Sequence, residues 1–203
     1  MKFRLHPVLL PFFLFLIAIG GLSVYVLIFL SLLIHEAGHL VAAHFAGMRV
    51  RSCTIMPYGG ELIIPNRNLA SKKARIFVAF GGPLATGLLL LSAMLFPFPG
   101  DEHVIRIQVA LLVLNLLPIL PLDGGQVLCV LLETGGSAYR TRELFLVHSI
   151  LFLLAACFLL ASSLPATVPY MLLALFLLIQ NISAFRFRKY EQAYAELKQK
   201  QLT

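Results

Sequence analysis

The stretch LIFLSLLIHEAGHLVAAHFAG, residues 27–47, places two histidines and a glutamate inside a long apolar run. Residues four apart lie on one face of a helix, so the imidazoles of His35 and His39 would point the same way, with Glu36 beside them. Two such imidazoles can hold one zinc ion, and a neighbouring carboxylate can take a proton from water that the metal has made acidic. The stretch therefore predicts a helix that carries a zinc site, with His35 and His39 as ligands and Glu36 as general base.

The composition is that of a membrane protein. Hydrophobic residues make up 60% of the chain, charged residues only 12%, and the mean hydropathy is +0.91. Soluble domains carry about 25% charged residues, and a domain of this size has too little interior to bury so much apolar surface. The net charge of +7 would suit nucleic acid, but the cations lie between apolar runs and at the termini instead of forming one stripe. We therefore expect contact with membrane lipid and no nucleic acid as a partner.

Six apolar runs follow one another along the chain, at 8–19, 22–46, 76–96, 104–117, 145–160 and 166–185. About 20 apolar residues cross a bilayer as a helix, which the second, third and sixth runs satisfy. The fourth run is expected to continue towards Asp123 as a broken segment, because Pro118 and Pro121 remove helical donors. The fold class expected is an all-α polytopic membrane protein with about six transmembrane helices.

The first run has a second interpretation. A positively charged start, twelve apolar residues and a glycine pair also fit a secretory signal peptide. The pair Gly20-Gly21 favours a tight turn directly into the next span. A retained short helix or re-entrant segment is therefore the preferred interpretation.

The charges predict the orientation of the spans. Of the 16 Lys and Arg residues, all but Arg106 fall at the N-terminus, in alternate loops of the six-span arrangement, or in the C-terminal tail. Positive loops stay cytoplasmic, so both termini are predicted to be cytoplasmic in a bacterial cell membrane. We expect residues 1–185 to form the six-span core and residues 186–203 a short basic tail, helical along the membrane surface.

Between the second and third runs, residues 49–65 mix polar and apolar residues around Pro57-Tyr58-Gly59-Gly60. Such a mixture around a turn predicts a short β-hairpin or re-entrant loop associated with the membrane.

A catalytic zinc ion needs a third protein ligand and an open fourth position. Asp123 is a candidate, at the end of the segment NLLPILPLDGG, residues 115–125. An aspartate before glycine is also common as a turn or helix-cap residue. The predicted spans favour the ligand, because they bring Asp123 and the histidine pair to a similar depth near the cytoplasmic side. The metal set predicted is His35, His39 and Asp123.

Other interpretations of the cluster have to be weighed. A metal transporter also uses intramembrane His, Glu and Asp residues, but it would spread them over several spans. A polar cluster that only packs helices would have to offset about 2.5–3.5 kcal/mol for each charged group at the centre of a span. The histidines at 6, 44, 103 and 148 lie at span ends, in a loop or on another helix face, and are not expected to be ligands. The three cysteines are isolated and predict no disulfide.

Several motifs together resemble the site-2 protease family of intramembrane zinc metalloproteases, peptidase family M50, including its members from bacterial sporulation. They are HEAGH at 35–39, PYGG at 57–60, GPL at 82–84, and the segment at 115–125. The resemblance implies Zn2+ at His35, His39 and Asp123, catalysis by Glu36, and substrate contacts at Asn115 and Pro121.

The same resemblance implies an intramembrane zinc endopeptidase that performs regulated proteolysis. Its substrate would be a membrane-associated protein, with a sporulation sigma-factor precursor (a pro-sigma factor) as the candidate, and inhibitory membrane proteins would be further partners. The sporulation members carry a regulatory domain of the CBS type after the last span. Residues 186–203 are too few for such a domain, so nucleotide control is not expected.

Overall fold

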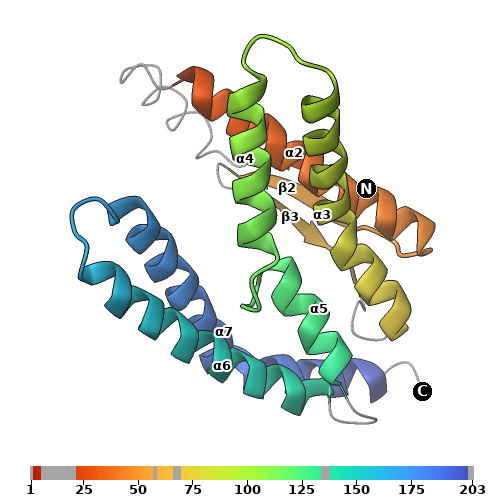
Figure 1. Cartoon of the computed structure of the whole chain (residues 1–203). Helices are drawn as coiled ribbons and strands as arrows, with labels where there is room; N and C mark the ends of the chain where they lie inside the picture. The colour runs from red at the N-terminus through yellow and green to blue at the C-terminus, as the bar shows by residue number, and fades with distance from the viewer. Residues whose placement is uncertain (1, 6–21, 57–58, 66–69, 134–137, 201–203) are drawn as a thin grey trace. The chain divides into compact units, whose positions relative to one another are not determined.

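The computed structural model describes residues 2–5, 22–56, 59–65, 70–133 and 138–200. The chain divides into two compact units, Met1–Leu116 and Leu117–Thr203, and each is described by itself. Helix and strand labels follow Figure 1.

The first unit combines three helices with a small sheet (Figure 1). The helices are α2 (Leu22–Phe45), α3 (Lys72–Leu95) and α4 (Asp101–Asn115). The strands are β1 (Lys2–Leu5), β2 (Ser52–Met56) and β3 (Gly59–Ile63), in the order β1-β2-β3. Strand β1 pairs parallel with β2, and β2 pairs antiparallel with β3. The unit is thus mostly helical, with a sheet built from the N-terminal strand and the two strands between α2 and α3.

Helices α2 and α3 make backbone contact. A Cβ atom added at Gly38 would collide with the carbonyl oxygen of Gly81 and would lie 2.6 Å from the Cβ of Ala85. A Cβ added at Gly81 would lie 2.7 Å from the Cβ of Ala42. Small residues allow this approach, which is the usual way in which membrane helices gain packing energy without a hydrophobic driving force. The histidine-bearing helix is therefore fixed against α3.

The second unit contains α5 (Asp123–Leu132), α6 (Ala138–Ala161) and α7 (Val168–Lys200). Helices α6 and α7 form a hairpin (Figure 1) with an apolar core around Ile119, Leu153 and Leu177. Near the far ends of this hairpin, the Arg188 guanidinium donates a hydrogen bond of 2.7 Å to the Glu143 carboxylate.

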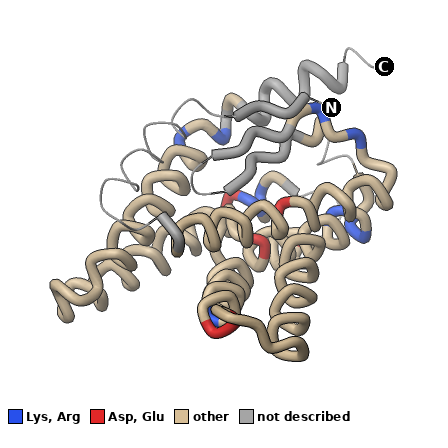
Figure 2. The backbone as a smooth tube through the Cα atoms, turned by 90° about the horizontal axis from the view of Figure 1, so that it is seen from above, with Lys and Arg blue, Asp and Glu red and all other residues tan. Residues whose placement is uncertain are grey.

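Four described helices are long and apolar enough to cross a membrane: Val24–Phe45, Lys72–Leu95, Tyr139–Ala161 and Val168–Arg188. The apolar parts of these helices carry few charges, as Figure 2 shows. The chain is a mostly helical membrane protein. The first apolar run, 8–19, lies outside the described residues, and α4 has only 15 residues.

The fourth run ends in the expected break, because α4 ends at Asn115 and a new helix, α5, begins at Asp123. Two other sequence expectations need correction. The fifth run, 145–160, is shorter than the helix that contains it, because α6 includes polar residues before the run and reaches 24 residues. Helix α7 continues without a break past residue 185 to Lys200, so most of the predicted tail extends the last helix.

The three strands can be compared with the predicted hairpin and with the expected all-α fold class. The antiparallel pair β2 and β3 occupies the range in which the sequence predicts a hairpin. Strand β1 was not predicted, because four residues at the N-terminus carry no recognisable alternation. The fold is therefore not purely α-helical.

Candidate metal centre

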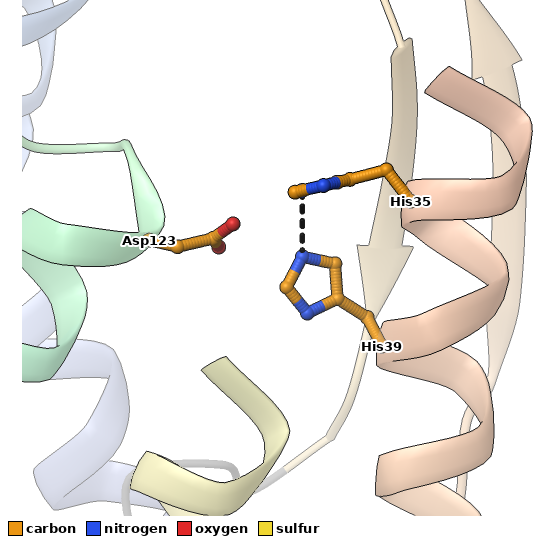
Figure 3. A group of neighbouring side chains, drawn as sticks. All are labelled: His35, His39 and Asp123. Carbon is orange, nitrogen blue, oxygen red and sulfur yellow. Dashed lines mark hydrogen bonds between the residues drawn. The ribbon is translucent and has the colours of Figure 1, made fainter. Parts of the chain in front are cut away.

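The two histidines of α2 lie side by side in the interior of the first unit. Their side chains are buried, with His35 3% and His39 8% exposed. The Nε2 atoms of the two rings are 3.2 Å apart, and the rings are nearly perpendicular, at 83° (Figure 3). The four-residue spacing thus brings two imidazole nitrogens to one point, as the sequence predicts.

Helix α3 contacts the Nδ1 atom of each ring. The Nδ1 atom of His35 lies 2.9 Å from the Thr86 hydroxyl, and the Nδ1 atom of His39 lies 2.8 Å from the Val78 carbonyl oxygen. A carbonyl oxygen only accepts, so Nδ1 of His39 carries the proton and Nε2 keeps its lone pair. The Gly82 N–H lies farther from the same Nδ1, at 3.2 Å, and the shorter bond to the carbonyl decides the tautomer.

This arrangement fits a metal ion. A cation between the two Nε2 atoms would be bound by both rings in place of the hydrogen bond that joins them. Zinc–nitrogen bonds of 2.0–2.1 Å at tetrahedral angles put two ligand nitrogens about 3.3 Å apart. The observed separation of 3.2 Å is close to that value. Hydrogen bonds from the second ring nitrogen to a carbonyl or hydroxyl are also typical of metal-binding histidines.

Gly82 adds a further sign that the point between the rings is kept open. A Cβ atom at Gly82 would collide with Nε2 of His39 and would lie 2.5 Å from Nε2 of His35. Any side chain at position 82 would therefore fill the place at which the two nitrogens converge.

Glu36 follows His35 on α2 and is half-buried. Its position on the helix, next to a buried metal-ligand candidate, is compatible with a carboxylate that handles protons beside the metal.

In the second unit, Asp123 is the first residue of α5 and is 7% exposed. The N-cap position of this helix belongs to Leu122, which makes no side-chain capping bond, so Asp123 is not the N-cap of α5. A Cβ added at Gly125 would collide with the carbonyl oxygen of Ile119. A glycine at position 125 is thus required for the preceding segment to fold back tightly onto the start of α5.

The two residues predicted to contact substrate belong to different units of the chain. Asn115 is the last residue of α4, and its Nδ2 donates to the Leu111 carbonyl at 3.0 Å. Pro121 is exposed, and its carbonyl accepts a hydrogen bond of 2.6 Å from the Gln126 side chain. Each is described in its own unit.

Sequence reasoning missed the groups on α3 that hold the rings. The carbonyl of Val78 has no sequence signal at all. Thr86 had one: it is a polar residue within an apolar run and lies one helical turn after Gly82, on the same face. Four histidines were not expected to be ligands. Of these, His44, His103 and His148 are exposed, and His6 lies outside the described residues.

Comparisons with known proteins find similarity to one protein family. The model of peptidase family M50 matches residues 23–99, which include both histidines. A solved structure, a site-2 protease from Methanocaldococcus jannaschii, has the same fold, with a TM-score of 0.65 over 90% of each chain at 19% identity. By sequence and by fold the chain is similar to the site-2 proteases, intramembrane zinc metalloproteases of peptidase family M50, which confirms the resemblance drawn from the motifs.

Two curated relatives are more specific. Stage IV sporulation protein FB of Bacillus subtilis is 29% identical over 94% of this chain and 68% of its own length. A zinc metalloprotease of Methanocaldococcus jannaschii is 27% identical over 61% of this chain and 41% of its own length. The chain thus spans about two thirds of the first relative and less than half of the second. These relatives favour the protease over the metal-transporter alternative.

Proposed function

We propose that this protein is an intramembrane zinc endopeptidase that cuts a membrane-associated protein substrate, with Zn2+ held by His35, His39 and Asp123 and with Glu36 as general base. The observation that carries the proposal is that the two Nε2 atoms lie 3.2 Å apart, while the Nδ1 atom of each ring is hydrogen-bonded to a group on α3. A buried pair of this kind in a membrane helix is costly unless a metal or a partner uses it.

Asp123 is the proposed third ligand. It is a buried carboxylate at the start of α5, and it belongs with the two histidines to a candidate group of metal ligands among the described residues. Two imidazoles and one carboxylate are an established ligand set for catalytic zinc, which keeps its fourth position open. That the Asp123 carboxylate and the two imidazoles bind the same metal ion is part of this proposal.

The chemistry divides between the metal and the chain. Zinc, when bound, polarises a substrate carbonyl and brings the pKa of water towards 7. Glu36 takes the proton from the attacking water and passes it to the amine that leaves when the peptide bond breaks. Thr86 and the Val78 carbonyl keep the imidazoles oriented while the charge in the site changes. The substrate segment has to be extended, because carbonyl groups in a helix are already hydrogen-bonded.

The membrane arrangement extends the proposal. The 8–19 run and the stretch from α4 to α5 would complete a six-span core with cytoplasmic termini, because the Lys and Arg residues of alternate loops then lie on one side. The β2–β3 pair would lie against the membrane near the substrate, with Asn115 and Pro121 contacting it. The similarity to a sporulation protein makes a membrane-bound sigma-factor precursor the substrate to test first, and inhibitory membrane proteins the partners to test next.

The test is co-expression with candidate membrane-tethered precursors, with cleavage read as a size shift. Glu36→Gln should keep the zinc and lower cleavage by about 10²–10⁴-fold, the usual contribution of general acid–base catalysis. Asp123→Ala and His35→Ala should both bind zinc more weakly and lose cleavage. Cleavage by Glu36→Gln at the wild-type rate would end the catalytic assignment.

A further inference from the structure

The backbone leading to Asp123 is held by two side chains from other helices of the same unit. The N–H of Leu120 donates to the Ser149 hydroxyl at 3.0 Å. The carbonyl of Leu120 accepts a hydrogen bond of 2.5 Å from Nδ2 of Asn181. Ser149 lies on α6 and Asn181 on α7, each within a helix that can span a membrane. Both polar groups of one residue, three positions before Asp123, are therefore fixed by α6 and α7.

Both side chains are themselves anchored. The Ser149 hydroxyl donates to the Phe145 carbonyl at 2.8 Å and so presents its lone pairs to Leu120. Nδ2 of Asn181 uses its second hydrogen for the Leu177 carbonyl, also at 2.8 Å. Because both neighbours of Nδ2 are carbonyl oxygens, the orientation of this amide follows from chemistry. Ser149 is 0% and Asn181 1% exposed, so neither bond competes with solvent.

Packing alone does not explain an asparagine at position 181. Its Oδ1 atom is buried and has no hydrogen-bond partner among the described residues. A buried polar atom without a partner costs about 1–3 kcal/mol, and a leucine would fill similar space at this apolar helix contact without that cost. The gain that offsets the cost is the bond that Nδ2 makes to Leu120.

The segment between Leu120 and Asp123 has little freedom left. Ile119, 1% exposed, sits in the apolar core of α6 and α7, and its carbonyl accepts from Leu122 N–H at 2.9 Å. The same turn leaves no room for a side chain at Gly125. A displacement of the Leu120 peptide would therefore be carried into the first turn of α5.

We propose that Ser149 and Asn181 are positioning residues that set the place of the Asp123 carboxylate through the Leu120 peptide group. This inference rests on the proposed function, in which Asp123 is a zinc ligand. Neither residue touches the metal or the substrate. Their contribution is to bind the ligand-bearing turn to α6 and α7, so that the carboxylate is held ready before zinc arrives.

The test measures zinc binding by full-length protein, purified in detergent and folded by size exclusion, in competition with a chelator. The variants are Ser149→Ala and Asn181→Leu, which remove the two bonds from different helices, so that one remains informative if the other does not fold. Ser149→Thr, which restores a hydroxyl, is the rescue. Ser162→Ala is the matched control, because Ser162 makes a similar bond to its own chain (2.7 Å to Leu159 O) but is exposed.

Loss of an outer-shell partner typically lowers metal affinity by about 10–100-fold. We expect at least about a tenfold loss in Ser149→Ala and Asn181→Leu, recovery in Ser149→Thr, and no change in Ser162→Ala. In an Asp123→Ala background the same changes should lower affinity no further, because they act through that carboxylate.

Wild-type zinc affinity in both variants, with only the thermal midpoint of the metal-free protein lowered, would overturn the inference and leave the proposed function standing. An undiminished loss in the Asp123→Ala background would also overturn it. Wild-type affinity in Asp123→Ala alone would instead refute the ligand set of the proposed function.

Discussion

The Cα of Gly82 on α3 faces Nε2 of His39 on α2 so closely that a methyl group at position 82 could not fit. The contact is between a helix backbone and the atom that would bind the metal. It links the packing of two membrane helices directly to the chemistry of the site.

Gly82→Ala should therefore block the metal without unfolding the helix. The added methyl would occupy the point between the two Nε2 atoms, and we expect at least about a hundredfold loss of zinc affinity, the upper end of the range for changes around a metal site. Chelator competition measures the loss. Gly87→Ala is the control on the same helix, because a Cβ there meets nothing within 4 Å. It should bind zinc normally and gain up to about 1 kcal/mol of stability. Normal zinc binding by Gly82→Ala would contradict the position of the site.

Thr86→Val tests the support behind His35. The change keeps the shape of the side chain but removes the hydroxyl that meets Nδ1 of His35 at 2.9 Å. The ring then loses the partner that orients it, and zinc affinity should fall by about 10–100-fold. Thr86→Ser, which keeps the hydroxyl, should retain most of the affinity. Equal affinities in the two variants would show that the hydroxyl has no part in holding the ring.

Gly38→Ala tests the contact between α2 and α3. A methyl group there collides with the Gly81 carbonyl, so the helices have to move apart. Overpacking of this kind typically costs about 1–3 kcal/mol. The measurement is the free energy of unfolding of the metal-free protein in detergent, with Gly87→Ala again as control. An unchanged stability would mean that the two backbones can separate freely at this level.

Arg188→Gln should have a small effect. The ion pair between Arg188 and Glu143 is short, 2.7 Å, but its two side chains are 25% and 37% exposed. Solvent screens such pairs, and their contribution is usually about 0–1 kcal/mol. We expect a small loss of unfolding free energy that shrinks at high salt, with cleavage unchanged. A double-mutant cycle with Glu143→Gln measures it, and a coupling well above this range would mean that the hairpin end depends on the pair.

The sequence was sufficient for the histidine half of the site. Apart from its serines, histidines and one glutamate, the run 22–46 is apolar and long enough to cross a membrane, so a helix is expected there, and α2 occupies Leu22–Phe45. Once the helix is given, the spacing of four residues alone brings the His35 and His39 rings together. Both steps depend only on local geometry, which a sequence contains.

The parts that could not be predicted depend on contacts between distant residues. The prolines at 118 and 121 indicate that the helix breaks, but they do not say that the chain resumes as a new helix at Asp123. The bonds from Ser149 and Asn181 to Leu120 join residues 29 and 61 positions apart. A serine or asparagine in an apolar run shows that a partner is needed without identifying it.

The contact of Gly38 with Gly81 also restricts how a scissile segment can approach. Where two spans touch backbone to backbone, there is no gap through which a third chain could slip sideways from the lipid. If the protein cleaves peptide bonds as proposed, the substrate has to reach the site along another side of α2. Cross-linking a trapped substrate should then mark residues away from the line where α2 and α3 meet.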